Sequence, residues 1–130
     1  MRSAGFPRAI VGEDSVEVRI SGSSPARRLP QRITLDFNLN GKIIGLEILG
    51  LKASAGENAS RPLQNDLEGN GVRVAYDNEA DALAAHVASD DSSDQESVDG
   101  WVELDSDARL VAIGAKFTPG RAAERHKARR

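Results

Sequence analysis

One segment carries oxygen-bearing side chains at the spacing of a calcium-binding loop. Asp36, Asn38 and Asn40 alternate, Gly41 follows, and Glu47 stands at the twelfth position. An EF-hand loop needs alternating oxygens, a glycine for the sharp turn, a bidentate carboxylate at the twelfth position and a helix on each side. Here the preceding residues alternate as in a strand, and the following residues have no helical period. We therefore favour a hairpin turn and keep calcium binding as the alternative.

A pair of aspartates offers a second chemistry. Asp14 and Asp81 occupy equivalent places before two predicted strands, so a pseudo-twofold arrangement could bring two carboxylates together for acid–base work. No partner base accompanies them, and turn capping by the aspartate side chain explains both positions. An enzyme that uses this pair stays an alternative. His86 has no second histidine and no cysteine for a metal site, and we expect His126 to be solvated in the basic tail, so we expect no cofactor and no catalytic residue.

Composition excludes several classes of protein. The chain has 130 residues and no cysteine, which rules out disulfides, thiolate metal centres and a cysteine nucleophile. No apolar run reaches the roughly 18 residues of a membrane span, and the N-terminus has no apolar signal-peptide segment. We expect a cytoplasmic protein that does not bind membranes, as a monomer or a homodimer.

Charge is unevenly distributed along the chain. Residues 77–107 contain eleven acids and no Lys or Arg, whereas residues 121–130 contain five bases and one acid. The simplest interpretation is a solvated acidic loop and a basic tail. The tail could instead bind nucleic acid or fold back on the acidic loop. Nucleic acid is the less favoured partner, because the body is acidic and no aromatic residue lies among the bases of the tail.

The sequence contains one pattern twice. Residues 33–48 return in shortened form as residues 102–115, and residues 13–20 return as residues 80–87. The offset is 67 at Asp14/Asp81 and at Leu46/Ile113, but 69 at Ile33/Val102. These offsets predict two extra residues in the connecting loop of the second copy and two fewer in its hairpin turn. Such a duplication determines the architecture before any single residue does.

Alternation of apolar and polar residues predicts strands at 16–20, 33–37 and 72–76. We also expect strands at 9–11, in the apolar run 43–49, at 82–88, and at 101–105 and 110–115 in the final hairpin. Segment 82–88 is rich in alanine and also favours a helix, but its equivalent in the first copy is a clear strand, so we predict a strand. Loops are expected at 21–30 and 89–100, with one helical turn near 63–68 and a short basic helix or tail at the C-terminus.

Together these elements predict a mainly β fold with two tandem antiparallel meanders of three to four strands each. We expect pseudo-twofold packing into a small sandwich or partly open barrel, because each meander alone has little core. The expected bounds are 9–52 for the first repeat, 53–71 for the linker, 72–117 for the second repeat and 118–130 for the basic tail. Tyr76 and Trp101 should anchor the second repeat. The other expected core residues are Val16, Val18, Ile20, Ile33, Leu35, Ile44, Leu46, Ile48, Val72, Val74, Leu83, Val87, Val102, Leu104, Val111 and Ile113.

Both copies resemble a small bacterial family, the domain of unknown function 2283. The second copy matches the family's opening as Tyr76-Asp-Asn-Glu-Ala-Asp-Ala-Leu83, and the first copy matches its final hairpin as Gly41-Lys-Ile-Ile-Gly-Leu-Glu-Ile-Leu49. The first copy lacks the Tyr-Asp start, and the second has Ala112 and Gly114 where the pattern has Gly and Glu. The resemblance implies a small antiparallel β meander and brings no established activity or catalytic residue. We expect a non-catalytic protein-interaction or regulatory module with a protein partner.

Overall fold

The computed structural model describes residues 5–118, and this part of the chain is mainly β-sheet. Its nine antiparallel strands form one sheet in the order β1-β2-β9-β8-β3-β4-β7-β6-β5. The elements in chain order are β1 (Arg8–Val11), β2 (Ser15–Arg19), β3 (Arg27–Phe37), β4 (Ile43–Leu49), helix α1 (Leu51–Ala55), the 3-10 helix η1 (Glu57–Leu63), β5 (Leu67–Gly69), β6 (Val72–Asp77), β7 (Ala82–His86), β8 (Asp94–Leu104) and β9 (Leu110–Lys116).

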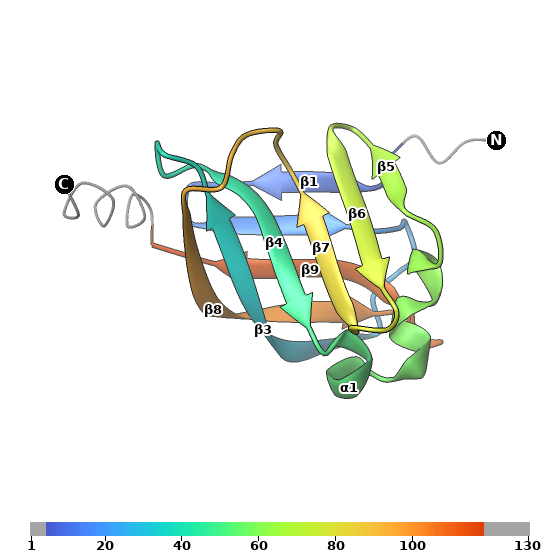
Figure 1. Cartoon of the computed structure of the whole chain (residues 1–130). Helices are drawn as coiled ribbons and strands as arrows, with labels where there is room; N and C mark the ends of the chain where they lie inside the picture. Colours follow the sequence, from blue (N-terminus) through green and yellow to red (C-terminus); the bar gives the residue numbers. More distant parts are fainter. Residues whose placement is uncertain (1–4, 119–130) are drawn as a thin grey trace.

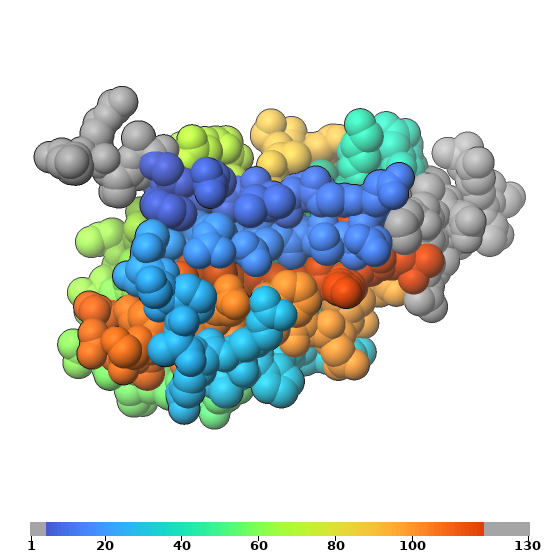
Figure 2. All heavy atoms as spheres, turned by 180° about the vertical axis from the view of Figure 1, so that it is seen from behind, coloured from blue at the N-terminus to red at the C-terminus, as the bar shows by residue number. Residues whose placement is uncertain are grey.

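The sheet curls into a nearly closed barrel with two layers. Strands β4, β7 and β6 cross steeply over β1, β2 and β9, and the long strands β3 and β8 join the two layers (Figure 1). Seen from behind, β1 and β2 run side by side across the rear face (Figure 2). The Asn70 side chain closes the gap between the two edge strands by donating to the Pro7 carbonyl oxygen over 3.0 Å.

The two copies are not separate meanders. A meander would place β2 beside β3, whereas β9 and β8 lie between them. Each copy instead contributes two hairpins, β1–β2 and β3–β4 from the first and β6–β7 and β8–β9 from the second, and these alternate around the sheet. Pairing with the other copy covers strand edges that isolated meanders would leave open.

A single offset of 67 relates the paired strands of the two copies. Val18 pairs with Ile113 between β2 and β9, and the equivalent Ala85 pairs with Leu46 between β7 and β4. The hairpins also match, because the register shifts at Asp36/Phe37 in one and at Glu103/Leu104 in the other. The expected offset of 69 at Ile33/Val102 is therefore wrong, and the two hairpin turns have equal length. A slip of two residues preserves the alternation of a strand, so the pattern alone did not detect it.

Two strands are longer than the sequence pattern predicts. β3 begins at Arg27 rather than after Pro30, and β8 begins at Asp94 inside the expected acidic loop. The two strands pair over their full lengths, from Arg27↔Leu104 to Phe37↔Asp94. Among residues 5–118, β8 is the only strand that pairs with the first part of β3, and a proline such as Pro30 is tolerated where one side of a strand is unpaired.

The helical segments also differ from the expected positions. They lie at 51–55 and 57–63, directly after β4, rather than near 63–68. The alanine-rich segment forms strand β7, as the repeat predicted. The basic tail lies outside the described residues from position 119 onward.

The core is close to the predicted one. Every predicted aliphatic core residue is buried except Val87, which is half-buried. Tyr76 is half-buried against the core, but Trp101 does not anchor the interior. Its indole lies on the outer face against Gly114, and the Arg28 guanidinium carbon lies 4.6 Å from the ring centroid. Further buried side chains come from Phe37, Leu51, Ala59, Leu63 and Leu110.

Candidate functional site

The calcium-like spacing lies in the β3–β4 hairpin, between two strands rather than two helices. Asn38 Oδ1 accepts the backbone N–H groups of Asn40 and Lys42, both over 2.9 Å. Gly41 has φ 79°, a left-handed conformation that suits glycine. The alternating asparagines thus stabilise a tight turn, as the favoured interpretation expected. Glu47 lies further along β4, where it pairs with Thr34.

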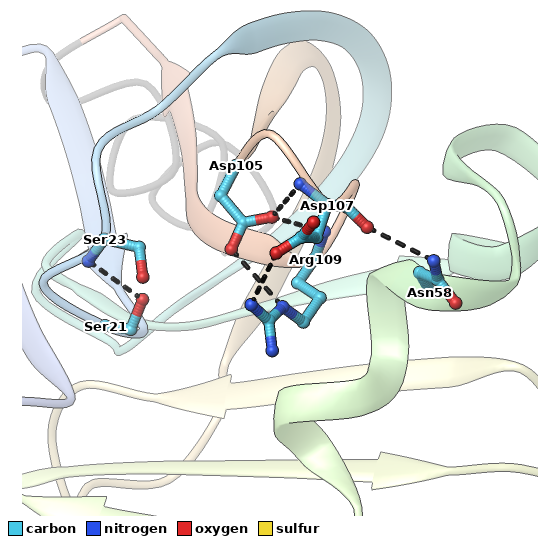
Figure 3. A network of polar contacts seen from close by, with 6 residues as sticks. All are labelled: Ser21, Ser23, Asn58, Asp105, Asp107 and Arg109. Atoms are coloured by element: carbon cyan, nitrogen blue, oxygen red, sulfur yellow. Dashed lines mark hydrogen bonds and ion pairs between the residues drawn. The ribbon is translucent and has the colours of Figure 1, made fainter.

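The second copy builds the same turn from different residues. Asp105 Oδ1 accepts the N–H groups of Asp107 and Arg109 over 2.9 and 3.0 Å (Figure 3). Ala108 takes the place of Gly41, with φ 62°. The second copy forms this turn without the spacing of a calcium-binding loop. Turn formation therefore explains that spacing in the first copy. Within residues 5–118, no group of three or more His, Cys, Asp or Glu side chains could hold a metal ion.

The two aspartates of the proposed acid–base pair lie at opposite ends of the barrel. Asp81 lies where β4 ends, because its carbonyl oxygen accepts the Gly50 N–H over 2.8 Å. Asp14 follows residues 11–13, which lie near the turn where β4 begins. The seven residues of β4 separate the two ends, which is roughly 23 Å at about 3.3 Å per residue. The structure does not bring the two carboxylates together.

Asp81 holds the start of helix α1 against the sheet. Its carboxylate accepts the backbone N–H groups of Lys52 and Ala53 over 2.8 and 3.1 Å, and the Tyr76 hydroxyl over 2.7 Å. Burial and the neighbouring Asp81 carboxylate raise the pKa of Tyr76 to about 12. Burial acts to raise the pKa of Asp81, but these hydrogen bonds outweigh it and hold that pKa below its ordinary value. A carboxylate engaged in this way stabilises structure and is not free to act as a base.

A polar cleft of about 560 Å³ lies beside this network. Its walls come from α1, η1 and the β6–β7 turn, and they include Lys52, Glu57, Arg61 and Tyr76. The sequence predicted Tyr76 as a core anchor and Asp81 as a turn cap, and only the structure shows that the two side chains contact each other. The cleft contains positively and negatively charged side chains but no activated nucleophile, so it does not indicate a particular reaction.

The remaining predicted candidates are solvent-exposed or outside the described residues. His86 is exposed near the end of β7, in a shallow cleft of about 400 Å³ that also contains Arg73, Asp90 and Asp91. His126 lies outside the described residues.

One end of the barrel is closed by the segment that follows β4. Leu51 and Ala55 of α1 and Ala59 and Leu63 of η1 are all buried. The Asn58 side chain fastens η1 to the β8–β9 turn by donating to the Asp107 carbonyl oxygen over 3.2 Å (Figure 3).

The other end carries an apolar hollow of about 340 Å³. Val11, Ile43 and Phe117 supply most of its apolar lining, and Glu13 and Lys42 supply its charge. Among the described residues, Ile10, Val11, Leu39 and Leu49 are the large apolar side chains that are exposed. Val11 lines the hollow and Leu39 lies on the neighbouring β3–β4 turn, whereas Ile10 lies on the opposite face of β1 from Val11. The hollow with these two exposed side chains is the best candidate binding surface.

Acidic residues lie next to this hollow. The Asn38 amide on the β3–β4 turn donates to Asp90 Oδ2 over 2.9 Å, which fixes the loop before β8. The hydrogen bonds from Asn38 and from the Asp91 N–H lower the pKa of Asp90. Asp90 and Asp91 line the neighbouring cleft, whereas Glu13 lines the hollow itself.

Comparisons with family models, with curated proteins and with solved structures find no match to this chain. No helix in residues 5–118 is long and apolar enough to cross a membrane.

Proposed function

We propose that this protein is a non-catalytic module that binds a protein partner through the open end of its barrel. The observation that carries the proposal is the apolar hollow beside Val11, Ile43 and Phe117, with Leu39 exposed on the adjacent turn. The opposite end is covered by buried residues of α1 and η1, so the two ends of one barrel differ in exposed apolar surface.

The rim indicates the chemistry of the partner. Glu13, Asp90 and Asp91 outnumber Lys42 and Arg73 around the hollow and the neighbouring cleft. A protein segment with one apolar side chain for the hollow and flanking Lys or Arg residues for the rim would satisfy both features. Charge complementarity of this kind favours specific association.

The separation of the two aspartates considered as an acid–base pair favours binding over catalysis. Asp81 is bonded to α1, and Asp14 lies at the far end of β4. We also propose that the chain belongs to the family of the domain of unknown function 2283. The pseudo-twofold origin of the fold is part of the same proposal. The resembling octet supplies both Tyr76 and Asp81 to the α1 network.

The test is a comparative affinity capture from lysate of the source cells. The full chain should retain a stoichiometric partner that a V11S/L39S variant loses at least about tenfold, since both substitutions remove exposed apolar contact area. L49S is the matched control, because Leu49 is 66% exposed on β4 away from the hollow. Recovery of the same partner by V11S/L39S, or of none by the wild-type chain, would refute the proposal.

A further inference from the structure

Strand β1 forms one edge of the sheet, and among residues 5–118 its only strand neighbour is β2. It borders the rear layer of the barrel (Figure 2). The other edge strand, β5, has three residues and lies against residues 6 and 7, because a Cβ at Gly69 would come within 3.2 Å of the Phe6 carbonyl oxygen. β1 begins after this contact and runs away from β5 (Figure 1).

The backbone of β1 presents hydrogen-bonding groups on its outer side. The Gly12 N–H donates to the Ser15 carbonyl oxygen over 2.8 Å, so these two residues form a hydrogen-bonded pair. Such pairs alternate with non-hydrogen-bonded pairs along an antiparallel ladder, so Ile10 is the next residue that is bonded to β2. The N–H and C=O groups of Ala9 and Val11 therefore point away from β2.

The contact at Pro7 sets the limit of this available edge. Its carbonyl oxygen, on the same outer side as the groups of Ala9, accepts the Asn70 side chain over 3.0 Å. A proline also has no N–H to donate to a further strand. An added strand can therefore pair with residues 8–11 but not with the residues before them.

The side chains of β1 do not protect this edge. Natural sheets often protect an exposed edge strand with lysine, proline or a bulge. Residues 8–11 contain neither lysine nor proline, and their pairing with β2 is regular. Ile10 and Val11 are 51% and 53% exposed, and Ile10 lies on the outer face, away from the hollow. Such a strand favours pairing with another extended segment.

The charges around β1 indicate which segment fits. Arg8 begins the strand, Glu13 and Asp14 follow its end, and all three are exposed. An antiparallel neighbour therefore needs an acidic residue beside Arg8, apolar residues in the middle and a basic residue beside Glu13. The β1 segment of a second copy has this order when it runs in the opposite direction.

We propose that two copies of this chain associate by pairing their β1 strands antiparallel about Ile10. Ala9 of each copy forms a hydrogen-bonded pair with Val11 of the other, which uses the outward backbone groups of both. The two Ile10 side chains meet on the outer face as a closely spaced, non-hydrogen-bonded pair. Arg8 of each copy lies beside the turn that carries Glu13 of the other.

The paired segments are short, so the dimer is reversible. Each strand has four residues, and interfaces well below about 1,000 Å² are weak. We expect a dissociation constant on the order of 0.1 mM. The dimer does not rest on the proposed function, because it forms without a partner and uses the backbone of Val11 rather than its side chain in the hollow.

Sedimentation equilibrium of the full chain tests the dimer between about 10 µM and about 1 mM. The wild-type chain should pass from monomer to dimer over this range. A9P removes an N–H group that points outward and leaves the bonds to β2 in place, as an edge strand allows. Because the symmetry removes this hydrogen bond twice, A9P should weaken association at least about tenfold.

E68P is the matched control on the other edge of the sheet. Glu68 is the middle residue of β5, and its N–H also points away from its partner strand, because Gly69 and Val72 form the hydrogen-bonded pair beside the turn. E68P should therefore dimerise as the wild-type chain does.

An exchange of charges tests the register of the pairing. R8E alone and E13R alone should each weaken self-association, because like charges then meet at both ends of the paired strands. Positions 8 and 13 are both acidic in the R8E chain and both basic in the E13R chain. An equimolar mixture should therefore form a mixed dimer with about the affinity of the wild-type chain. Both positions are exposed, so these variants test the proposal even if A9P does not fold.

Three results would overturn the proposal. The first is a wild-type chain that stays monomeric at about 1 mM. The second is a dimer that A9P leaves intact or that E68P abolishes while both variants melt as the wild type does. The third is a mixture of R8E and E13R that associates no better than either variant alone. A monomeric chain whose partner is lost by V11S/L39S would refute only the dimer, and a dimer whose partner is insensitive to V11S/L39S would refute only the partner surface.

Discussion

Asp81 and Asp14 show how one residue type takes different roles at matching positions of a repeat. The Asp81 carboxylate accepts two backbone N–H groups of α1 and the Tyr76 hydroxyl, whereas Asp14 is exposed and its backbone oxygen accepts the Phe117 N–H. An asparagine keeps the shape of Asp81 and tolerates its φ of 52°. D81N should therefore lower the free energy of unfolding by about 1–3 kcal/mol at neutral pH, because it weakens hydrogen bonds to a charged acceptor. Denaturant unfolding measures this loss.

The pH dependence of stability tests the same charge. The pKa of Asp81 is lowered from 3.8 in the folded protein, so its contribution is present above that value and is lost as pH falls through the folded pKa. The wild-type chain should lose this stability below about pH 4, and D81N should show a flatter profile over that range. D14N is the control and should match wild type within about 0.5 kcal/mol. A D14N effect as large as that of D81N would contradict the role given to the α1 network.

At the scale of elements, β8 gains a second neighbour, β9, at Gly100 while it stays paired with β3. This glycine pairs with Gln31 on β3 and Ala115 on β9, where the strand passes from one layer to the other. An added Cβ would collide with the Gly114 carbonyl oxygen and lie 2.7 Å from Ile33 Cδ1. G100A should therefore destabilise the protein by about 1–3 kcal/mol, since backbone cannot yield as a side chain can. Thermal unfolding measures it.

Gly12 provides the control for that substitution. A Cβ at Gly12 would approach the Ser15 hydroxyl at 3.2 Å and no closer atom, and a hydroxyl rotates readily. G12A should change the melting temperature little. If G100A were as mild as G12A, the close packing of β8 on β9 would be wrong.

The sequence predicted the elements better than their pairing. Alternation located β2 and β6, the apolar runs located β4 and β9, and the repeat correctly chose a strand for the alanine-rich β7. The sequence did not show that β8 begins inside the acidic loop, because the residues from Asp94 to Asp99 are mostly polar and form a strand by pairing with β3. The role of Asp81 was equally hidden, because α1 is 29 residues away in the sequence at Lys52. Long-range partners of this kind leave no local pattern.

At the scale of the whole molecule, the halves depend on each other. In the first half, β2, β3 and β4 each have a neighbour from the second half, and no ladder joins β2 to β3. The first half alone would be two unconnected hairpins, and the second half would be one hairpin and the short three-stranded β5–β6–β7, with no ladder between them. Isolated hairpins are marginal in water. Fragments 1–64 and 65–130 should each be largely unfolded and should fold when mixed. Circular dichroism and light scattering would follow the mixing, and a folded monomeric fragment would refute the interleaved topology.

A residue pair at the centre of the molecule also predicts whether each half associates with itself or with the other half. Arg32 lies opposite Asp99 at the middle of the β3–β8 ladder, and these two positions are equivalent at the offset of 67. Their side chains form an ion pair of 2.9 Å. Two copies of the first half would place Arg32 opposite Arg32, and two copies of the second would oppose two aspartates. Like charges directly opposite each other destabilise a ladder. A mixture of the two halves should therefore form the dimer of one first half with one second half. With R32D in the first half, two aspartates would face each other in this mixed dimer, so the second half should favour it less. If self-associated and mixed dimers formed in equal amounts with both the wild-type and the R32D first half, the Arg32–Asp99 pair would not determine which halves associate.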